Sequence, residues 1–321
     1  MSDIFEAAPT TGTASPTTAE KQVEQTREVQ RRKIRAAIVR RRFLSGLSLG
    51  AIYAFLIIMT IFALFPFYYV IQASLNGTQN LYTTELRLFP TIVTLDNYVH
   101  DFTQLPIFAW LWNTIFVCVI STGIGLLFSM TGAYALSRFR FRGRELTLNL
   151  LLALQAFPGL LAITAYYYIL QSLNLLAQPL IALAIIYSAG TLVFATWNIK
   201  GYFDTLPVEL EQAAMLDGAT HTQAFFQVTL PLALPALAAS ALLMFIGGWN
   251  EYPLANFIIN ANPSGSNQTF ILGLYSLQGT FTTPWGYFAA GSVIITIPLM
   301  ILFLYAQRFF QSGLTVGGVK G

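Results

Sequence analysis

Apolar stretches of about 20 residues recur along this sequence and constrain its fold more than any other feature. A helix needs about 20 apolar residues to cross the ~30 Å hydrocarbon core of a bilayer. Because lipid offers no partner for backbone N–H and C=O groups, a helix, which pairs them internally, suits such a stretch. We therefore predict an all-α integral membrane protein with six transmembrane helices, over residues 47–70, 113–136, 148–170, 179–197, 236–258 and 287–306.

The composition agrees with a membrane protein and excludes a large soluble catalytic domain. Of the 321 residues, 55% are hydrophobic and 10% are charged, whereas a soluble domain carries about 25% charged residues. The net charge of +3 gives no indication of a nucleic-acid partner. The single cysteine, Cys118, lies in an apolar run and is interpreted as a packing residue.

Lysine and arginine are distributed very unevenly around the predicted spans. Nine of the 17 precede the first span, four lie at 138–144, and Lys200, Arg308 and Lys320 follow later even-numbered spans. Only Arg87 falls on the opposite side. Cytoplasmic loops carry an excess of basic residues. We therefore predict that both termini are cytoplasmic.

The chain divides into five segments by composition. Residues 1–20 are rich in Thr, Ala, Ser and Pro and are predicted to form a disordered cytoplasmic tail. Residues 21–42 are predicted to form a basic cytoplasmic helix, because acidic residues come early and arginines late. The six-span domain covers 43–312, with a core of about 113–310 and a polar loop at 201–235, and a Gly-rich cytoplasmic tail covers 313–321.

The polar loop between the fourth and fifth spans contains a short predicted helix. Pro207 suits a helix start, and acidic residues in the first turn favour the helix dipole. Gly218 can adopt positive φ and end the helix. One face of this helix is apolar and thin, which would allow it to enter a groove of another protein; it carries Leu206, Leu210, Ala213 and Ala214.

The same loop resembles the EAA loop of the permease subunits of bacterial binding-protein-dependent ABC importers. The matching residues are Gln212-Ala213-Ala214, Asp217-Gly218, Leu230-Pro231 and Pro235. Gln212 stands where that motif has glutamate, and Glu211 precedes it. Gln212 can hydrogen-bond to the ATPase in place of a salt bridge, or Glu211 can substitute for the motif glutamate. The resemblance implies that the ATPase-coupling residues are Glu209, Glu211, Gln212, Ala213, Ala214, Asp217 and Gly218.

The end of the chain narrows the resemblance. The residues AQRFF at 306–310, GLTVGGVKG at 313–321 and WGYFAA at 285–290 look like those of maltose-type carbohydrate permeases, in particular the MalG-like subunit. The likeness covers residue 43 onward. It implies a type-1 ABC importer permease fold in the bacterial inner (cytoplasmic) membrane. It also implies three protein partners, namely a second permease subunit, an ATPase homodimer and an extracytoplasmic sugar-binding protein, within the surrounding membrane lipid.

Motifs for enzymatic chemistry are missing from the sequence. It contains no Gly-x-x-x-x-Gly-Lys-Ser/Thr phosphate loop, no metal-binding cluster and no catalytic set; its two histidines, His100 and His221, lie on opposite sides of the predicted membrane. We expect no enzyme activity and no cofactor in this chain. ATP and Mg²⁺ are expected on the partner ATPase.

Candidates for the translocation path are few. Glu251 is the only ionisable residue inside a predicted span, beside Trp249, Asn250 and Tyr252. It can line a cavity or gate, or it can lie near the outer interface, where water reaches it and aromatic residues are common. Tyr167, within a run of three tyrosines, is a candidate for stacking on a sugar, although packing is the alternative.

Three functions remain open at this stage. The resemblance favours a permease subunit of an ATP-driven carbohydrate importer, with maltose or maltodextrin as substrate. The first alternative is a permease of the same class for another neutral solute, since the predicted spans contain no Arg or Lys for an anion. The second is an ion-coupled secondary transporter, which would need Glu251 as its ion site.

Overall fold

A computed structural model describes residues 49–79, 88–261, 267–279 and 283–317. These residues are helical apart from connecting turns and one isolated antiparallel bridge between Asn76 and Val93. The chain divides into two units, Met1–Pro66 and Phe67–Gly321. The tail and basic helix predicted over 1–42 lie outside the described residues.

Four helices are long and apolar enough to cross a membrane, and they match four of the predicted spans. They are Leu49–Ser74, Ile107–Arg138, Pro179–Phe203 and Trp285–Phe309. In the first of them, no residue of the most hydrophobic 18-residue stretch is buried. A bent pair, His221–Leu232 with Leu234–Trp249, makes five if it counts as one span.

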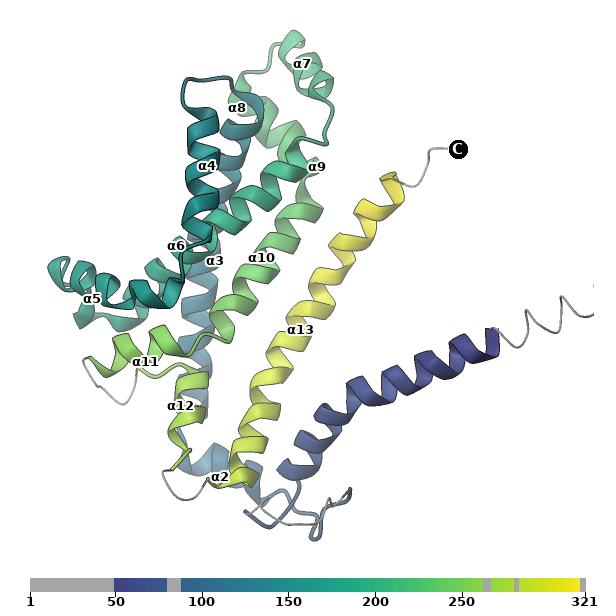
Figure 1. The fold of residues 1–321 in the computed structure, drawn as a ribbon, viewed down its shortest axis with the longest axis vertical. Helices are drawn as coiled ribbons and strands as arrows, with labels where there is room; N and C mark the ends of the chain where they lie inside the picture. Colours follow the sequence, from purple (N-terminus) through teal and green to yellow (C-terminus); the bar gives the residue numbers. More distant parts are fainter. Residues whose placement is uncertain (1–48, 80–87, 262–266, 280–282, 318–321) are drawn as a thin grey trace, which may run out of the picture. The chain divides into compact units, whose positions relative to one another are not determined.

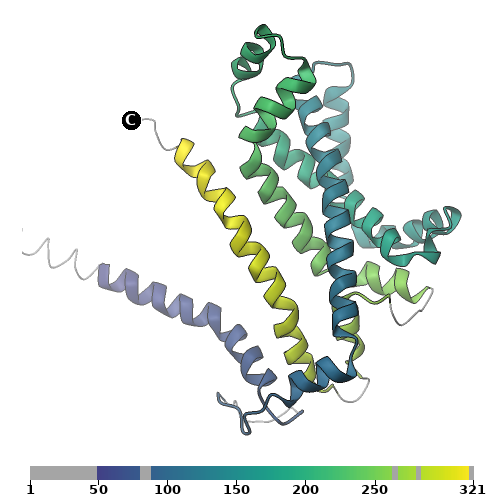
Figure 2. The same cartoon turned by 180° about the vertical axis from the view of Figure 1, so that it is seen from behind.

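The second unit is built around α3 (Ile107–Arg138), α6 (Pro179–Phe203), α10 (Leu234–Trp249) and α13 (Trp285–Gly317). Figures 1 and 2 show α3, α6 and α10 side by side, with α13 along α10. Gly125 permits the close approach of α3, since a Cβ there would lie 2.2 Å from Met244 Cε and 3.3 Å from the Ser188 carbonyl oxygen. A methyl group there would therefore require the end of the Met244 side chain to move and the Ser188 backbone to shift by a few tenths of an ångström.

The third predicted span, 148–170, is not one helix. The structure has α4 (Arg144–Gln155), a 3₁₀ turn η1 (Gly159–Ala162) and α5 (Ile163–Ser172), and α5 leaves the direction of α4 (Figure 1). Pro158 explains the break, because proline has no N–H to donate and disfavours the helical conformation of the residue before it. Apolar length alone overestimated the continuity of this segment.

The fifth predicted span, 236–258, is also divided. The chain forms α8 (His221–Ala224), a π-helical turn η3 (Phe225–Thr229) and α9 (Leu230–Leu232), and bends by 75° before α10. Pro231 and Pro235 lack the N–H groups that would continue regular i→i−4 bonding. This bend precedes the predicted span. The division within 236–258 comes after Trp249, where α10 ends and the chain starts a separate helix, α11 (Pro253–Asn260).

Short elements complete the unit. They are α2 (Asp96–Gln104), η2 (Leu175–Ala177), α7 (Val208–Leu216) and α12 (Phe270–Ser276). At the end of the chain, α13 continues to Gly317, so the first part of the predicted Gly-rich tail is helical, and 318–321 lie outside the described residues.

Candidate functional site

The polar loop forms the short helix that its sequence predicts. Pro207 is the N-cap of α7 and Asp217 its C-cap, and Gly218 has φ +96°. This positive φ ends the helix in a conformation that glycine adopts without strain. Thr220 and Gln223 then form a reciprocal capping box that starts α8. Helix α7 stands at one end of the bundle, beyond α8 and α9 (Figure 1).

A buried ion pair attaches α7 to the end of α3. Arg138 Nε donates to Glu211 Oε1 at 2.6 Å, and Tyr134 OH donates to Glu211 Oε2 at 3.0 Å. Arg138 Nη2 also donates to the Leu206 carbonyl oxygen at 3.1 Å. The side chains of Arg138 and Glu211 are each only 9% exposed. One guanidinium thus holds both the helix and the residue that leads into it.

A second ion pair attaches the start of the loop to α6. Lys200 Nζ donates to Asp204 Oδ2 at 2.6 Å, and Ser137 Oγ donates to Asp204 Oδ1 at 2.6 Å. Burial opposes ionisation of Asp204, but the hydrogen bonds from Lys200 and Ser137, with the charges of Lys200 and Arg144, hold its pKa below the usual value. This carboxylate therefore links α3 and α6 at the point where the loop begins.

An aromatic cluster lies beneath the ion pairs. The Tyr134 ring lies 4.6 Å from Phe225 and 6.1 Å from Phe203, between centroids. Phe203 is fully buried, and Phe225 is 5% exposed. Phe225 begins the π-helical turn, so this irregular turn is packed against α3 and α6 rather than free.

The predicted coupling residues fall on two sides of α7. Glu211 points inward to Arg138, and Ala214 is partly buried. The exposed face follows the i, i+3, i+4, i+7 spacing of one helix side and carries Glu209, Gln212, Ala213 and Leu216. Leu216 is 89% exposed and gives this face an apolar side chain. The motif position Gln212 therefore lies on the outward face.

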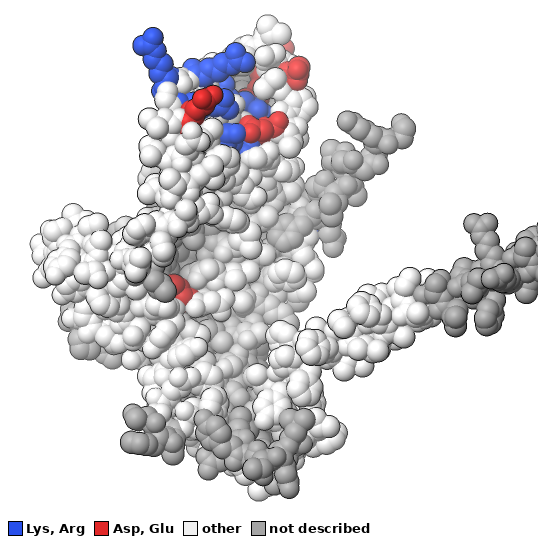
Figure 3. Space-filling view, in the orientation of Figure 1, with Lys and Arg blue, Asp and Glu red and all other residues white. Residues whose placement is uncertain are grey.

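Sequence reasoning did not identify Arg138 and Tyr134 as members of this site. Arg138 is one of four arginines within 138–144 and was interpreted only as a marker of orientation. Its partner lies 73 positions later, and no local pattern indicates which arginine is used. In the face shown in Figure 3, lysine and arginine gather at this end of the molecule, together with several acidic side chains.

The translocation-path candidates near Glu251 have mainly structural contacts. Trp249 is 1% exposed and stacks on Phe245 at 5.3 Å, so it belongs to the core. Asn250 is exposed and caps α10 through the Ile246 carbonyl oxygen. Tyr252 stacks on Tyr275 at 4.5 Å.

Glu251 itself joins three elements. Its Oε2 accepts a hydrogen bond from Tyr187 OH at 2.6 Å, and its two oxygens accept from the N–H groups of Leu254 and Ala255 at the start of α11. A carboxylate at a helix N-terminus satisfies free N–H groups and favours the dipole. The contacts of Glu251 are therefore those of a helix cap anchored to α6.

Tyr167 is partly buried and its ring contacts Tyr168 and Phe257, each at 5.8 Å. Cys118 is 1% exposed in a core cluster, which agrees with its interpretation as a packing residue.

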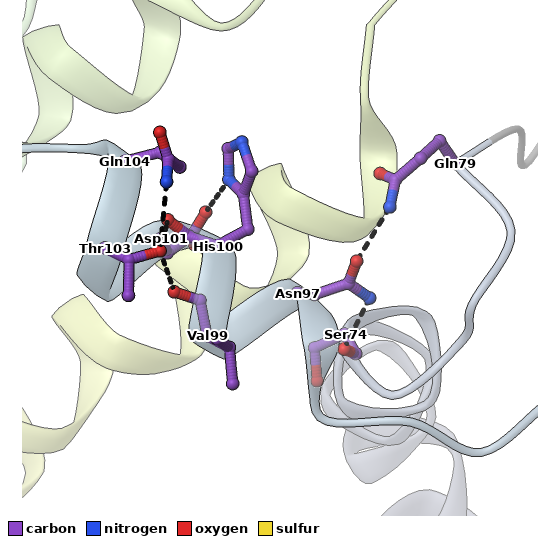
Figure 4. Close-up of polar contacts among 8 residues, drawn as sticks. All are labelled: Ser74, Gln79, Asn97, Val99, His100, Asp101, Thr103 and Gln104. Atoms are coloured by element: carbon purple, nitrogen blue, oxygen red, sulfur yellow. Dashed lines mark hydrogen bonds and ion pairs between the residues drawn. The ribbon is translucent and has the colours of Figure 1, made fainter.

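A polar cluster lies at the opposite end of the unit, around α2 (Figure 4). Asn97 Nδ2 donates to the carbonyl oxygens of Ser74 and Asn76, and Asn97 Oδ1 accepts from Gln79 Nε2. Gly286 lets α13 approach this cluster, since a Cβ there would lie 2.8 Å from Asn97 Oδ1.

The next turn of α2 contains a buried carboxyl. Asp101 is fully buried, with its Oδ1 3.4 Å from His100 Nδ1, and the His100 ring stacks on Tyr287 at 3.7 Å. Burial raises the pKa of Asp101 to about 6, although the hydrogen bond and charge of His100 oppose the rise.

A family model agrees with the resemblance seen in the loop. The model of the binding-protein-dependent transport system inner membrane component matches residues 125–316. This range contains α7, its contact residues and the helices around them.

Individual relatives and one solved structure extend the match. A maltose/maltodextrin transport system permease protein of Vibrio vulnificus is 39% identical over 67% of this chain and 73% of its own. A sulfoquinovosyl glycerol transport system permease protein of Agrobacterium fabrum is 34% identical over 87% and 96%. The fold is similar to that of one chain in the crystal structure of a bacterial ABC transporter involved in alginate import. The TM-score is 0.70 and the identity is 24%, and the match covers 83% of this chain and 98% of the other.

Proposed function

This chain belongs to the family of binding-protein-dependent transport system inner membrane components, and on that premise we propose that it is a permease subunit of an ATP-driven carbohydrate importer. Its location is the inner membrane. Membership of this family implies a partner ATPase and a partner that binds the substrate. The proposal adds a second permease subunit and an ATPase homodimer that binds ATP and Mg²⁺.

The observation that carries the proposal is the two-sided construction of α7. Its inner side is fixed to α3 by the buried Arg138–Glu211 pair, and its outer side presents Gln212 and the exposed Leu216. A helix that is held firmly on one side and exposes apolar surface on the other can pass a force from a docked protein to the bundle. We assign this outer side to the ATPase.

The path of this force follows from the contacts. Displacement of α7 is transmitted through Arg138 to α3, and displacement of the loop start is transmitted through Asp204 to α6. Buried, packed elements move as units rather than deforming continuously. The proposed consequence is that closure of the ATPase pair tilts α3 and α6 together. A loaded binding protein then shifts the equilibrium only by preferring one of the two orientations.

The topology and substrate belong to the same proposal. Six spans with both termini cytoplasmic require that α4 with α5, and the bent pair ending in α10, each count as one crossing.

We propose a neutral carbohydrate, with maltose or maltodextrin as the first candidate because of the 39% identity to a maltose/maltodextrin permease. The sulfoquinovosyl glycerol transport system permease protein is 34% identical over a larger part of the chain, so sugars other than maltodextrin are also candidates.

The test is reconstitution of the assembled complex in liposomes with each energy source supplied separately. We expect a labelled maltodextrin to accumulate in liposomes that contain ATP inside and are given binding protein outside. Collapse of the proton gradient at constant ATP should leave this accumulation unchanged. Transport driven by an imposed ion gradient without ATP would overturn the proposal. A panel of other neutral sugars tests the substrate independently of the energy source.

A further inference from the structure

The loop that joins α3 to α4 carries a basic cavity. The cavity has a volume of about 530 Å³ and is lined by Arg140, Phe141, Arg142, Gly143, Arg144, Glu145 and Leu146. Three guanidinium groups thus meet one carboxylate, so the lining is positively charged. It also includes the N-terminus of α4, whose N–H groups favour an anion.

Two of these arginines have no partner within the part of the chain that the structure describes. Arg138, just before them, is committed to Glu211, and Arg144 Nε donates to the Leu136 carbonyl oxygen at 2.7 Å. Arg140 and Arg142 are exposed and form no hydrogen bond or ion pair there. Phe139, between Arg138 and Arg140, adopts an extended conformation, and its ring contacts Tyr134.

An apolar stripe begins at the cavity and runs along α4. Leu146, Leu150 and Leu154 lie at i, i+4 and i+8 on one face and are 63%, 54% and 63% exposed. No residue of α4 is buried. At 1.5 Å per residue, the stripe extends about 12 Å from the basic cavity. A ligand that fits both features has an anionic head and an apolar chain.

We propose that this surface binds an anionic phospholipid, with the phosphate among Arg140, Arg142 and Arg144 and an acyl chain along the leucine stripe. Arginine is suited to phosphate because its planar group donates two parallel hydrogen bonds. Charge complementarity selects the headgroup, and the continuity of cavity and stripe selects a lipid over a free anion.

Native mass spectrometry of the purified full chain tests this proposal. The chain is titrated with phosphatidylglycerol and, separately, with phosphatidylcholine of the same acyl chains. We expect phosphatidylglycerol to bind about tenfold more tightly, because its net charge is not cancelled by a choline group. In Arg140→Gln/Arg142→Gln, the affinity for phosphatidylglycerol is expected to fall about tenfold, to that for phosphatidylcholine.

The control is Arg308→Gln, which removes one positive charge from α13, where Arg308 stacks on Tyr305. It should keep the preference. Equal binding of the two lipids to the unaltered chain would overturn the proposal. This comparison does not depend on whether the variants fold. An equal loss in Arg308→Gln would show a general charge effect instead. Displacement of the lipid by inorganic phosphate at equal concentration would show a free-anion site and overturn the role of the stripe.

Discussion

At the scale of single residues, two sets of buried polar groups lie at the two ends of the bundle. Arg138 and Glu211 hold the proposed coupling helix, whereas Asn97 holds α2 against the residues before it and Asp101 lies buried on the same helix. A buried charge is costly without a partner, and these groups differ in how well they are paired. Arg138 and Glu211 satisfy each other, but Asp101 Oδ2 has no hydrogen-bond partner among the described residues.

Removal of one member of the Arg138–Glu211 pair should destabilise the protein more than removal of both. Arg138→Gln leaves the Glu211 carboxylate buried without its cation, at an expected cost of about 3–5 kcal/mol. Arg138→Gln/Glu211→Gln should recover part of this loss, because no charge remains. Thermal unfolding of the purified variants measures the difference. Strictly additive losses from the two single variants would show that the pair is not coupled.

Asp101 predicts a pH dependence at the other end. Its pKa is raised from 3.8 to about 6, so its charged form is disfavoured in the folded state. The folded state is therefore less stable as pH rises from about 4 through 6, by up to about 3 kcal/mol at pH 7. The melting temperature of Asp101→Asn should change less between pH 4.5 and pH 7.5 than that of the unaltered chain. An identical pH profile for both proteins would contradict this assignment.

At the scale of elements, proline and glycine decide where sequence prediction succeeds. Pro207 and Gly218 bound α7 as predicted, because each acts locally at a helix end. Pro158 divides the third predicted span, and the fifth is divided between Trp249, where α10 ends, and Pro253, where α11 begins, although apolar length suggested continuous helices. Length and apolarity predict that a segment enters the membrane but not its path within it. The partner of Glu211, 73 residues away in Arg138, depends on helix packing, which the sequence pattern does not contain.

Gly218 should be needed for the position of α7 rather than for insertion. A side chain at φ +96° costs about 1–2 kcal/mol of local strain, even though a Cβ there meets no atom within 4 Å. Gly218→Val should therefore insert normally but lose ATPase stimulation by the sugar-loaded binding protein.

The matched control is Gly201→Ala, since Gly201 in α6 also has open space around it but no positive φ. It is compared with Gly218→Ala, so that both variants add the same methyl group. Equal stimulation in these two variants would rule out the backbone conformation of Gly218 as the cause.

At the scale of the molecule, α3 connects the two ends. Its 32 residues extend about 48 Å. Near its start, Thr114 Oγ1 accepts from the N–H of Phe270 at 2.7 Å and Asn113 Nδ2 donates to the Gln268 carbonyl oxygen at 2.9 Å, both at α12. At its end, Arg138 holds α7. One helix thus joins the proposed ATPase contact to elements at the opposite end, which is the connection that coupled transport requires.

The central claim is that the outer face of α7 contacts the ATPase, and site-directed cross-linking tests it most directly. Cys118 is 1% exposed, so a cysteine introduced at Gln212 is the main reactive thiol among the described residues. In the assembled complex, Gln212→Cys is expected to cross-link to the ATPase, and the yield should change when ATP is added. The control Phe102→Cys, at an exposed position of α2 at the other end, should give no such product. A transport-competent complex in which Gln212→Cys captures no ATPase, or captures it no better than Phe102→Cys, would contradict the account.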